Sequence, residues 1–250
     1  MRIEATTNAK VKAVRRLHRS RERRQTGRTI VEGPKLLESA LDAGIVPLEV
    51  YTTAEGSLTT RCAAAGSHVF EVTRPVLSAL STTVEPQDCV GVISTPEPPE
   101  LQVRRTAVGV AIRDPGNAGT LIRTAAALGW QIAFLDGPDP WSPKVLRASA
   151  GTQLSHPAVH IGSIEDLEAT GLALVAATVD GGLEPSELAV DLPIALLIGS
   201  EAHGLSEAVV DACRYSVTIP MPGETESLNA AVAAAIAMYV LGDHTDKPRA

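Results

Sequence analysis

Long apolar runs alternate with helical segments throughout residues 106–250. The runs consist mainly of Ala, Val, Leu and Ile, as in AVGVAIRD from Ala107, LALVAATVDG from Leu172 and PIALLIGS from Pro193. A strand that is apolar on both faces needs cover on both faces, as in a parallel sheet with helices on each side. Only 3% of the chain is aromatic although 44% is hydrophobic, which suits a core of small aliphatic side chains. The expected fold class is therefore α/β, with a parallel-sheet domain in residues 106–250.

A second, smaller α/β pattern occupies residues 1–95. TIVEGPKLLESALDAG from Thr29 predicts a short strand, a turn at Gly33-Pro34 and a helix, and further strands and helices follow as far as CVGVIS. The next segment, TPEPPELQVRR, holds three prolines and predicts an extended connector. We therefore expect a small domain in residues 1–95, a linker in residues 96–105 and the larger domain beyond it.

Positive charge is concentrated at the N-terminus of an otherwise acidic chain. Residues 1–28 hold ten Lys and Arg against two Glu, whereas the whole chain has a net charge of −7. The Arg-rich run lies in a predicted helix over residues 8–24, and it indicates either a surface for a polyanion or a merely solvated basic helix. Because the run lacks the bulky apolar face of a membrane-surface helix, nucleic acid is the favoured partner.

The cysteines and the apolar segments indicate a soluble protein of a reducing compartment. Cys62, Cys89 and Cys213 are odd in number and lack the spacing of metal ligands, so we expect neither a disulfide framework nor a metal site. The N-terminus does not resemble a signal peptide, and the most apolar run, residues 228–241, is shorter than the ~20 residues that span a bilayer. We expect a cytoplasmic protein that does not enter a membrane.

Polar side chains gather in three stretches that each run from a predicted strand end through a turn into a helix. The stretches are DPGNAGTLIRTAAALG from Asp114, LLIGSEAHGLS from Leu196 and IPMPGETESLNAAVAAAIAMY from Ile219. In open α/β sheets ligands bind at the carboxyl ends of strands, and the glycines in these turns would let a ligand approach the backbone. The candidate catalytic residues there are Asn117, Arg123, Glu201, Ser227 and Asn229. Taken singly, Asn117 or Glu201 could serve only to begin a helix.

The three stretches resemble the motifs of the SpoU (TrmH-like) family of the SPOUT superfamily, whose members are RNA ribose 2′-O-methyltransferases. The matching residues are Asn117, Gly119 and Arg123 in the first motif, Gly199, Glu201 and Gly204 in the second, and Ile219, Pro220, Met221, Ser227, Leu228 and Asn229 in the third. PKVLRASAG from Pro143 resembles a family segment between motifs, and IVEGPKLLESAL resembles the RNA-binding substrate domain that precedes many of these catalytic domains. Ala231 departs from the pattern, because many relatives carry a Ser at that position.

This resemblance implies a trefoil knot in the C-terminal domain, S-adenosyl-L-methionine as the cofactor, and an active site shared across a homodimer. The residues expected to hold the cofactor are Thr178, Gly199, Ile219, Met221 and Leu228, and no metal is implied. Adenosine needs an apolar slot with backbone donors and acceptors, which loops between strands and helices can supply.

The resemblance also implies roles for the candidate catalytic residues. In the family, the Arg that matches Arg123 is the proposed base. A guanidinium with a pKa above ~12 does not lose its proton in proteins, so the alternative is that Arg123 holds phosphate while another group takes the proton. Asn117 would orient Arg123 or the ribose. Glu201 would accept hydrogen bonds that order the site, and Ser227 with Asn229 would fix the loop and the substrate.

The expected activity is methylation of a ribose 2′-hydroxyl in RNA. A separate small domain with a basic N-terminus resembles the ribosomal-RNA enzymes of the family more than the compact transfer-RNA enzymes, which favours large-subunit ribosomal RNA. A transfer-RNA 2′-O-methyltransferase and a non-catalytic RNA-binding relative are the alternatives. The chain retains Arg123, Glu201 and Asn229, which a fold without turnover would not require.

Overall fold

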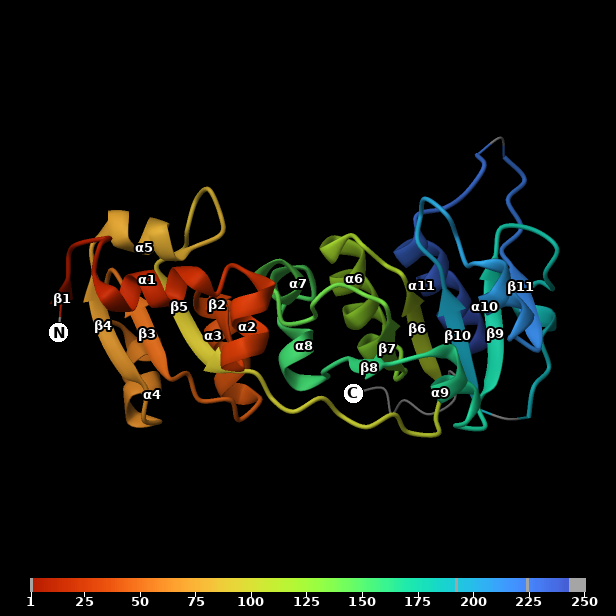
Figure 1. Ribbon diagram of the computed structural model, residues 1–250, viewed down its shortest axis with the longest axis horizontal. Coiled ribbons are helices and arrows are strands. Elements are labelled where there is room, and N and C mark those ends of the chain that lie inside the picture. Colours follow the sequence, from red (N-terminus) through yellow and green to blue (C-terminus); the bar gives the residue numbers. More distant parts are fainter. Residues whose placement is uncertain (1, 192, 224, 243–250) are drawn as a thin grey trace. The chain divides into compact units, whose positions relative to one another are not determined.

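The computed structural model describes residues 2–191, 193–223 and 225–242, and the chain forms two compact units. Unit 1 consists of residues 1–97 and 139–156, and unit 2 consists of residues 98–138 and 157–250. Figure 1 labels the helices and strands of both units. The segment 139–156 thus clusters with the N-terminal part of the chain. The predicted division into residues 1–95, 96–105 and 106–250 stays a prediction.

Unit 1 contains a five-stranded sheet with the strand order β1-β4-β3-β5-β2. The strands are β1 (Arg2–Ile3), β2 (Arg28–Glu32), β3 (Glu49–Thr52), β4 (His68–Val72) and β5 (Cys89–Ser94). β1, β4 and β3 are parallel, whereas β5 is antiparallel to both β3 and β2. The helices are α1 (Ala9–Arg16), α2 (Ser20–Thr26), α3 (Pro34–Asp42), α4 (Ser57–Ala64), α5 (Arg74–Leu80), α7 (Pro143–Ala148) and α8 (Thr152–Ser155). The predicted strand, turn and helix from Thr29 are therefore confirmed as β2 and α3.

Two hydrophobic clusters form the core of unit 1. Because successive side chains of a strand point to opposite faces, neighbours such as Ile30 and Val31 belong to different clusters. Helices α1 and α5 contribute to the first cluster, and α3, α4, α7 and α8 contribute to the second. Leu146 of α7 and Leu154 of α8 are both buried in the second cluster. Burial of each Leu contributes about 1.5–3 kcal/mol, which explains why segment 139–156 packs in unit 1.

The predicted single helix over residues 8–24 is wrong, because the structure has two helices with a break at residues 17–19. The N–H groups of Leu17, His18 and Arg19 bond to carbonyls three residues earlier, which tightens and ends the first helix. The side chain of Arg23 stabilises the break: its Nη1 donates to the carbonyl oxygens of Leu17 (2.8 Å) and His18 (3.0 Å). Its Nε and Nη2 donate to Oδ2 of Asp139 at 2.8 and 2.7 Å. A contact 116 residues away in the chain therefore decides where the helix ends.

Unit 2 contains a six-stranded, wholly parallel sheet with the strand order β11-β9-β10-β6-β7-β8. The strands are β6 (Thr106–Val110), β7 (Gln131–Leu135), β8 (Val159–Ile161), β9 (Ala173–Thr178), β10 (Ile194–Ile198) and β11 (Tyr215–Thr218). The helices are α6 (Pro115–Ala127), α9 (Ile164–Glu168), α10 (Glu207–Asp211) and α11 (Ala230–Leu241), with a 3₁₀ turn η1 (Pro185–Glu187). The predicted parallel-sheet α/β fold is confirmed.

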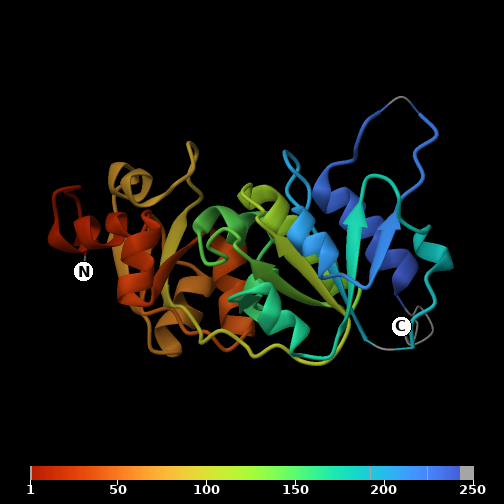
Figure 2. The same cartoon turned by 45° about the vertical axis from the view of Figure 1, so that its right-hand side comes forward.

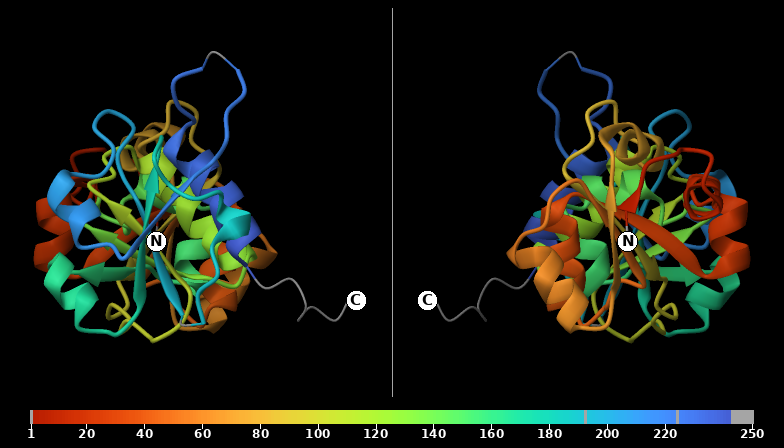
Figure 3. Two further views of the ribbon diagram at one scale, coloured as in Figure 1. Left: turned by 90° about the vertical axis from the view of Figure 1, so that its right-hand side faces the viewer. Right: turned by 90° about the vertical axis from the view of Figure 1, so that its left-hand side faces the viewer.

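Helices cover both faces of the unit 2 sheet. Figure 3 shows α9 and α10 on one face and α6 and α11 on the other. Residues of α9 and α10 pack on Val108, Val110, Ala195 and Leu197, which explains why these strands are apolar. Residues 219–223 and 225–229, between β11 and α11, extend from the carboxyl ends of the strands (Figure 2). Strand order alone does not show how the chain is threaded, so the trefoil knot stays a prediction.

Within residues 2–191, 193–223 and 225–242, each helix is too short or too polar to span a bilayer.

Candidate functional site

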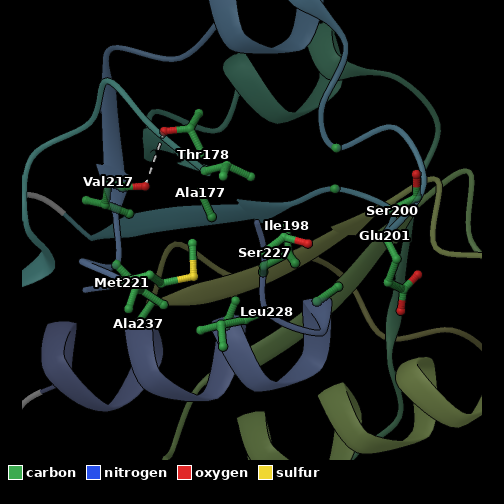
Figure 4. A pocket seen from close by; sticks show the side chains of 16 residues that line it. Ala177, Thr178, Ile198, Ser200, Glu201, Val217, Met221, Ser227, Leu228 and Ala237 are labelled. Atoms are coloured by element: carbon green, nitrogen blue, oxygen red, sulfur yellow. Dashed lines mark hydrogen bonds between the residues drawn. The ribbon is translucent and has the colours of Figure 1, made fainter. Parts of the chain in front are cut away.

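Loops that follow three neighbouring strands of unit 2 enclose a pocket. The strands are β11, β9 and β10, which are adjacent in the sheet in that order. The lining residues are Ala177, Thr178, Val179, Ile198, Gly199, Ser200, Glu201, Gly204, Val217, Ile219, Met221, Ser227, Leu228, Ala230, Ala233 and Ala237. Figure 4 shows α11 along one side of the pocket and the strand ends along the other. The pocket therefore lies where open parallel sheets bind their ligands.

All five residues predicted to hold a cofactor line this pocket. They are Thr178, Gly199, Ile219, Met221 and Leu228. Of the five predicted catalytic residues, Glu201 and Ser227 also line it, whereas Asn117, Arg123 and Asn229 do not. The second and third motifs thus meet at one pocket, although they are separated in the sequence.

Glycines allow the pocket loops to pass close to other backbone. A Cβ on Gly199 would overlap the backbone of Gly204, and a Cβ on Gly182 would lie 2.7 Å from the carbonyl carbon of Val217. Gly204 itself has a φ of 61°, in the left-handed region that favours glycine. The glycines at 182 and 199 are therefore needed for contacts within the protein.

Asn229 and Asn117 connect the third motif to the first. Asn229 caps α11, because its Oδ1 accepts hydrogen bonds from the N–H groups of Ala231 (3.0 Å) and Val232 (3.2 Å). Its Nδ2 must therefore donate, and it donates to Oδ1 of Asn117 at 3.1 Å. Asp114 holds Asn117 in place by accepting a hydrogen bond from its backbone N–H at 3.0 Å. Since the Asn117 oxygen is used in this way, its Nδ2 is the group that can reach a substrate oxygen.

Arg123 lies on α6, six residues after Asn117, and its side chain is exposed. Within the described part of the chain it has no hydrogen-bond or ion-pair partner and does not line the pocket. Its five N–H donors are therefore available to an external anion. The structure brings Asn117 and Asn229 together but leaves Arg123 outside the pocket of the single chain.

The electrostatic character of the pocket restricts its ligand. Among the described residues that line it, Glu201 carries the only charge, and it lies at the opposite end of the pocket from Met221 (Figure 4). Most of the other lining side chains are aliphatic, with hydroxyl groups from Thr178, Ser200 and Ser227. A phosphate would find no cation here, whereas a cationic ligand with an apolar ring system suits this lining.

The cysteines are poor nucleophiles at neutral pH. Burial raises the pKa of Cys89 to about 12 and that of Cys213 to about 11, and it also raises the pKa of Cys62. The thiolate is the reactive form of cysteine, and none of the three residues lines the pocket. The site therefore favours direct transfer to an acceptor over a covalent cysteine intermediate.

Two features of the pocket were missed in the sequence. Ala230, Ala233 and Ala237 line it from α11, and their spacing of three and four residues along the helix is the signal that could have found them. Thr218 does not line the pocket itself but contacts a residue that does. Its Oγ1 lies 3.1 Å from that of Thr178 and accepts a hydrogen bond from the N–H of Gly182 at 3.0 Å.

Two other motif residues lie outside the pocket lining. Ala231, where the resemblance leads one to expect Ser, is only 1% exposed and does not line the pocket. The missing hydroxyl group therefore does not alter the lining. His203 lies in the turn closed by the hydrogen bond from the Gly204 N–H to the Ser200 carbonyl, and it is exposed outside the lining.

Comparison with known proteins matches both parts of the chain. The SpoU rRNA methylase family matches residues 105–239, and the MRM3-like substrate-binding domain matches residues 8–91. The chain belongs to the SpoU rRNA methylase family. The resemblance to this family and to its preceding substrate-binding domain is thus confirmed.

Individual SpoU relatives match over nearly the whole chain. The 23S rRNA (guanosine(2553)-2′-O)-methyltransferase RlmP of Bacillus subtilis is 32% identical over 244 residues, covering 96% of this chain and 98% of RlmP. The crystal structure of an AdoMet-bound rRNA methyltransferase from Sinorhizobium meliloti is 29% identical with a TM-score of 0.86, covering 96% of this chain and 97% of that one. The SpoU methyltransferase AviRb from Streptomyces viridochromogenes, solved with AdoMet, is 27% identical with a TM-score of 0.83, covering 94% and 97%.

Proposed function

We propose that this SpoU protein uses S-adenosyl-L-methionine to methylate a ribose 2′-hydroxyl of large-subunit ribosomal RNA. The observation that carries the proposal is the single pocket in which the second and third motifs meet, since all five predicted cofactor residues line it. The activities of RlmP and AviRb, relatives that cover both units, support the choice of reaction and of ribosomal RNA.

The residues of the pocket suit S-adenosylmethionine. Its adenine needs an apolar slot, which Ile198, Ile219 and Leu228 can form. The ligand carries a sulfonium and an ammonium group, and the carboxylate of Glu201 is the charged group that complements them. A nucleotide with phosphates would lack a cation in this lining, which separates the proposal from ATP or nicotinamide chemistry.

Methyl transfer to a ribose requires residues around the pocket that bind and orient the RNA. When bound, S-adenosylmethionine supplies a methyl group that the ribose 2′-oxygen takes while its hydroxyl proton is lost. We assign Asn117 Nδ2 to donate to a ribose oxygen, because its own oxygen is occupied by Asn229. Arg123 holds the adjacent RNA phosphate, since a permanently protonated guanidinium cannot act as the base. Ser227 lines the pocket at the loop that Asn229 fixes to α11.

A homodimer would complete this site. Val232, Ile236, Tyr239 and Val240 form an exposed apolar stripe on α11, with 39–58% of each side chain accessible. Their spacing places them on one face of the helix, opposite the buried Ala231, Ala234 and Met238. A second copy of the chain covers this stripe in our proposal, and an Arg123 guanidinium reaches the RNA phosphate next to the methyl donor across the resulting interface.

The stripe gives a prediction for oligomeric state. Ile236→Asp places a charge at its centre and should convert a dimer to a monomer in sedimentation velocity, with loss of methyl transfer. Val103→Asp is the matched control, because Val103 is 63% exposed but lies outside α11. A wild-type protein that sediments as a monomer while fully active would exclude the shared site.

The reaction itself is tested with S-adenosylmethionine labelled in its methyl group. The protein is incubated separately with deproteinised large-subunit ribosomal RNA, small-subunit ribosomal RNA and transfer RNA, and the digested nucleosides are separated. We expect label in a 2′-O-methylnucleoside from the large-subunit RNA. Label only in transfer RNA would establish a transfer-RNA 2′-O-methyltransferase. RNA binding without label in any pool would establish a non-catalytic RNA-binding protein.

The remaining parts of the proposal concern the N-terminal domain and location. We propose that residues 1–95 bind the RNA and that residues 106–250 carry the methyl transfer. A ribosomal-RNA substrate places the enzyme where ribosomes are assembled, which we take to be the cytoplasm.

A further inference from the structure

A cationic hollow lies at the turn between α1 and α2 of unit 1. Its lining residues are Lys12, Arg15, Arg16, His18 and Arg19, and its volume is about 420 Å³. Four of these five side chains carry a positive charge at neutral pH, and the described lining contains no acidic residue. Lys12, Arg15, Arg16 and Arg19 are spaced three and four residues apart, so they gather on one side of α1 and the following turn.

Three other basic residues of the N-terminus are paired with carboxylates. Arg23 pairs with Asp139, Lys10 with Glu49, and Arg2 with Glu4. Those three charges are neutralised within the protein.

The cations of the hollow are not neutralised in this way. Lys12, Arg15, Arg16 and Arg19 are exposed and have no ion-pair or hydrogen-bonding side-chain partner within the described part of the chain. An external anion can therefore take these four positive charges.

The carbonyl oxygens at the C-terminal end of α1 are paired in the interior, so this end of the helix does not repel an anion. A helix C-terminus presents unpaired carbonyl oxygens and the negative end of the helix dipole. Here the guanidinium of Arg23, which is only 5% exposed, donates hydrogen bonds to the carbonyl oxygens of Leu17 and His18 from the interior of the unit. His18 Nε2 in turn donates to the carbonyl of Leu80 at 2.8 Å, which fixes the ring at the edge of the hollow. The negative groups are turned to the interior while the cations face outward.

The packing of α1 favours a row of phosphates over a membrane surface as the anion that binds here. A helix that binds a membrane surface inserts an apolar face among the lipids. The bulky apolar residues of this helix and turn, Val11, Val14 and Leu17, are all 5% exposed or less, because they lie in the core of unit 1. No bulky apolar face of α1 remains to enter a bilayer, whereas a row of phosphates needs only the cations.

We propose that this hollow binds backbone phosphates of the RNA substrate, with Lys12, Arg15, Arg16 and Arg19 as the binding residues and Arg23 as a positioning residue. The inference rests on the proposed function in one respect, namely that the polyanion is RNA. The hollow lies in unit 1 and involves neither the cofactor pocket nor its motifs. It is therefore a second RNA contact, in addition to the one proposed at the pocket of unit 2. Phosphate contacts position an RNA without reading its sequence, so the hollow contributes affinity and register.

The test compares two double variants that remove the same charge. Arg15→Gln/Arg19→Gln removes two cations of the hollow, and Arg21→Gln/Arg24→Gln removes two exposed cations of α2 that do not line it. The full-length proteins are titrated with deproteinised large-subunit ribosomal RNA at several salt concentrations. Loss of two contacts should reduce the slope of log K against log salt by about 1.4, taking ~0.7 per single-strand phosphate. We expect affinity to fall at least about tenfold at 0.15 M salt for the first pair and less than about twofold for the second, because Arg21 and Arg24 do not line the hollow.

Several outcomes would overturn the inference. Equal losses in both double variants would indicate a diffuse charge effect, and no loss in either would show that RNA binds elsewhere. Binding to phosphatidylserine vesicles that depends on Arg15 and Arg19, without such dependence for RNA, would assign the hollow to a membrane. Thermal unfolding confirms that each variant is folded, since all four residues are exposed.

The same experiment separates this inference from the proposed function. RNA binding is measured without methyl transfer, so a wild-type protein that binds RNA through the hollow but transfers no methyl group would contradict only the proposed reaction. If the reaction proceeds, the Arg15/Arg19 variant should raise KM for RNA and leave kcat nearly unchanged. An active double variant with wild-type KM would contradict only the hollow.

Discussion

Replacement of Arg123 by Ala should lower methyl transfer at least about 100-fold, while S-adenosylmethionine still binds with its wild-type affinity. The loss is of the size expected when a substrate is no longer held in the reactive position, since misplacement by about 1 Å can cost about 100-fold in rate. Cofactor binding should persist because Arg123 does not line the pocket. Folding should also persist, since the side chain is exposed on α6 and Ala is a strong helix former.

The comparison variants make the Arg123 prediction specific. Arg214→Ala removes another exposed arginine of unit 2, which stacks on the ring of Tyr215, and it should leave the rate unchanged. Arg123→Lys retains the charge but not the planar fork, and it should recover part of the activity if the residue holds phosphate. Activity is measured by label transfer and cofactor affinity by calorimetry. Full activity of Arg123→Ala would remove the residue from the mechanism.

Replacement of Gly199 by Ala should reduce cofactor affinity at least about tenfold. The new Cβ would overlap the backbone of Gly204, and backbone cannot move aside as the end of a flexible side chain can. Forcing an extra methyl group into a packed site costs typically about 1–3 kcal/mol. Because Gly199 and Gly204 both line the pocket, the loop shift that relieves the overlap changes the pocket itself.

Gly223→Ala provides the matched control for this prediction. Gly223 belongs to the third motif, and a Cβ there would meet no atom within 4 Å. Both variants are titrated with S-adenosylmethionine, and their thermal unfolding is recorded. Gly199→Ala with wild-type cofactor affinity would show that the pocket tolerates the shift or that the cofactor binds elsewhere.

The local patterns of the sequence were sufficient to predict the sheet of unit 2. Continuous apolar strands, such as Ile194–Ile198, can be stable only with helices on both faces, and the structure shows that cover. The loops at the strand ends were predicted as the site for the same reason, since parallel strands bring their carboxyl ends to one edge. The residues predicted to hold the cofactor, which lie at the ends of β9, β10 and β11 and in the loops after them, accordingly line one pocket.

Long-range contacts account for what the sequence did not reveal. The break between α1 and α2 depends on Arg23, whose partner Asp139 is 116 residues away. Segment 139–156 packs with unit 1 because Leu146 and Leu154 are buried there. The local sequence PKVLRASAG does not indicate which part of the chain it packs against. Residue pairs of this kind are fixed by tertiary packing, which a single sequence does not encode in its periodicity.

In our proposal, the loops after β9, β10 and β11 form the binding site of a methyl donor. A crystal structure of the full chain with S-adenosylhomocysteine, the product left by the donor, tests this most directly. We predict that the adenosine lies in the pocket against Ile219 and Leu228, and that a second copy of the chain covers the apolar stripe of α11. The nucleoside bound at another place in unit 2, with this pocket empty, would contradict the claim.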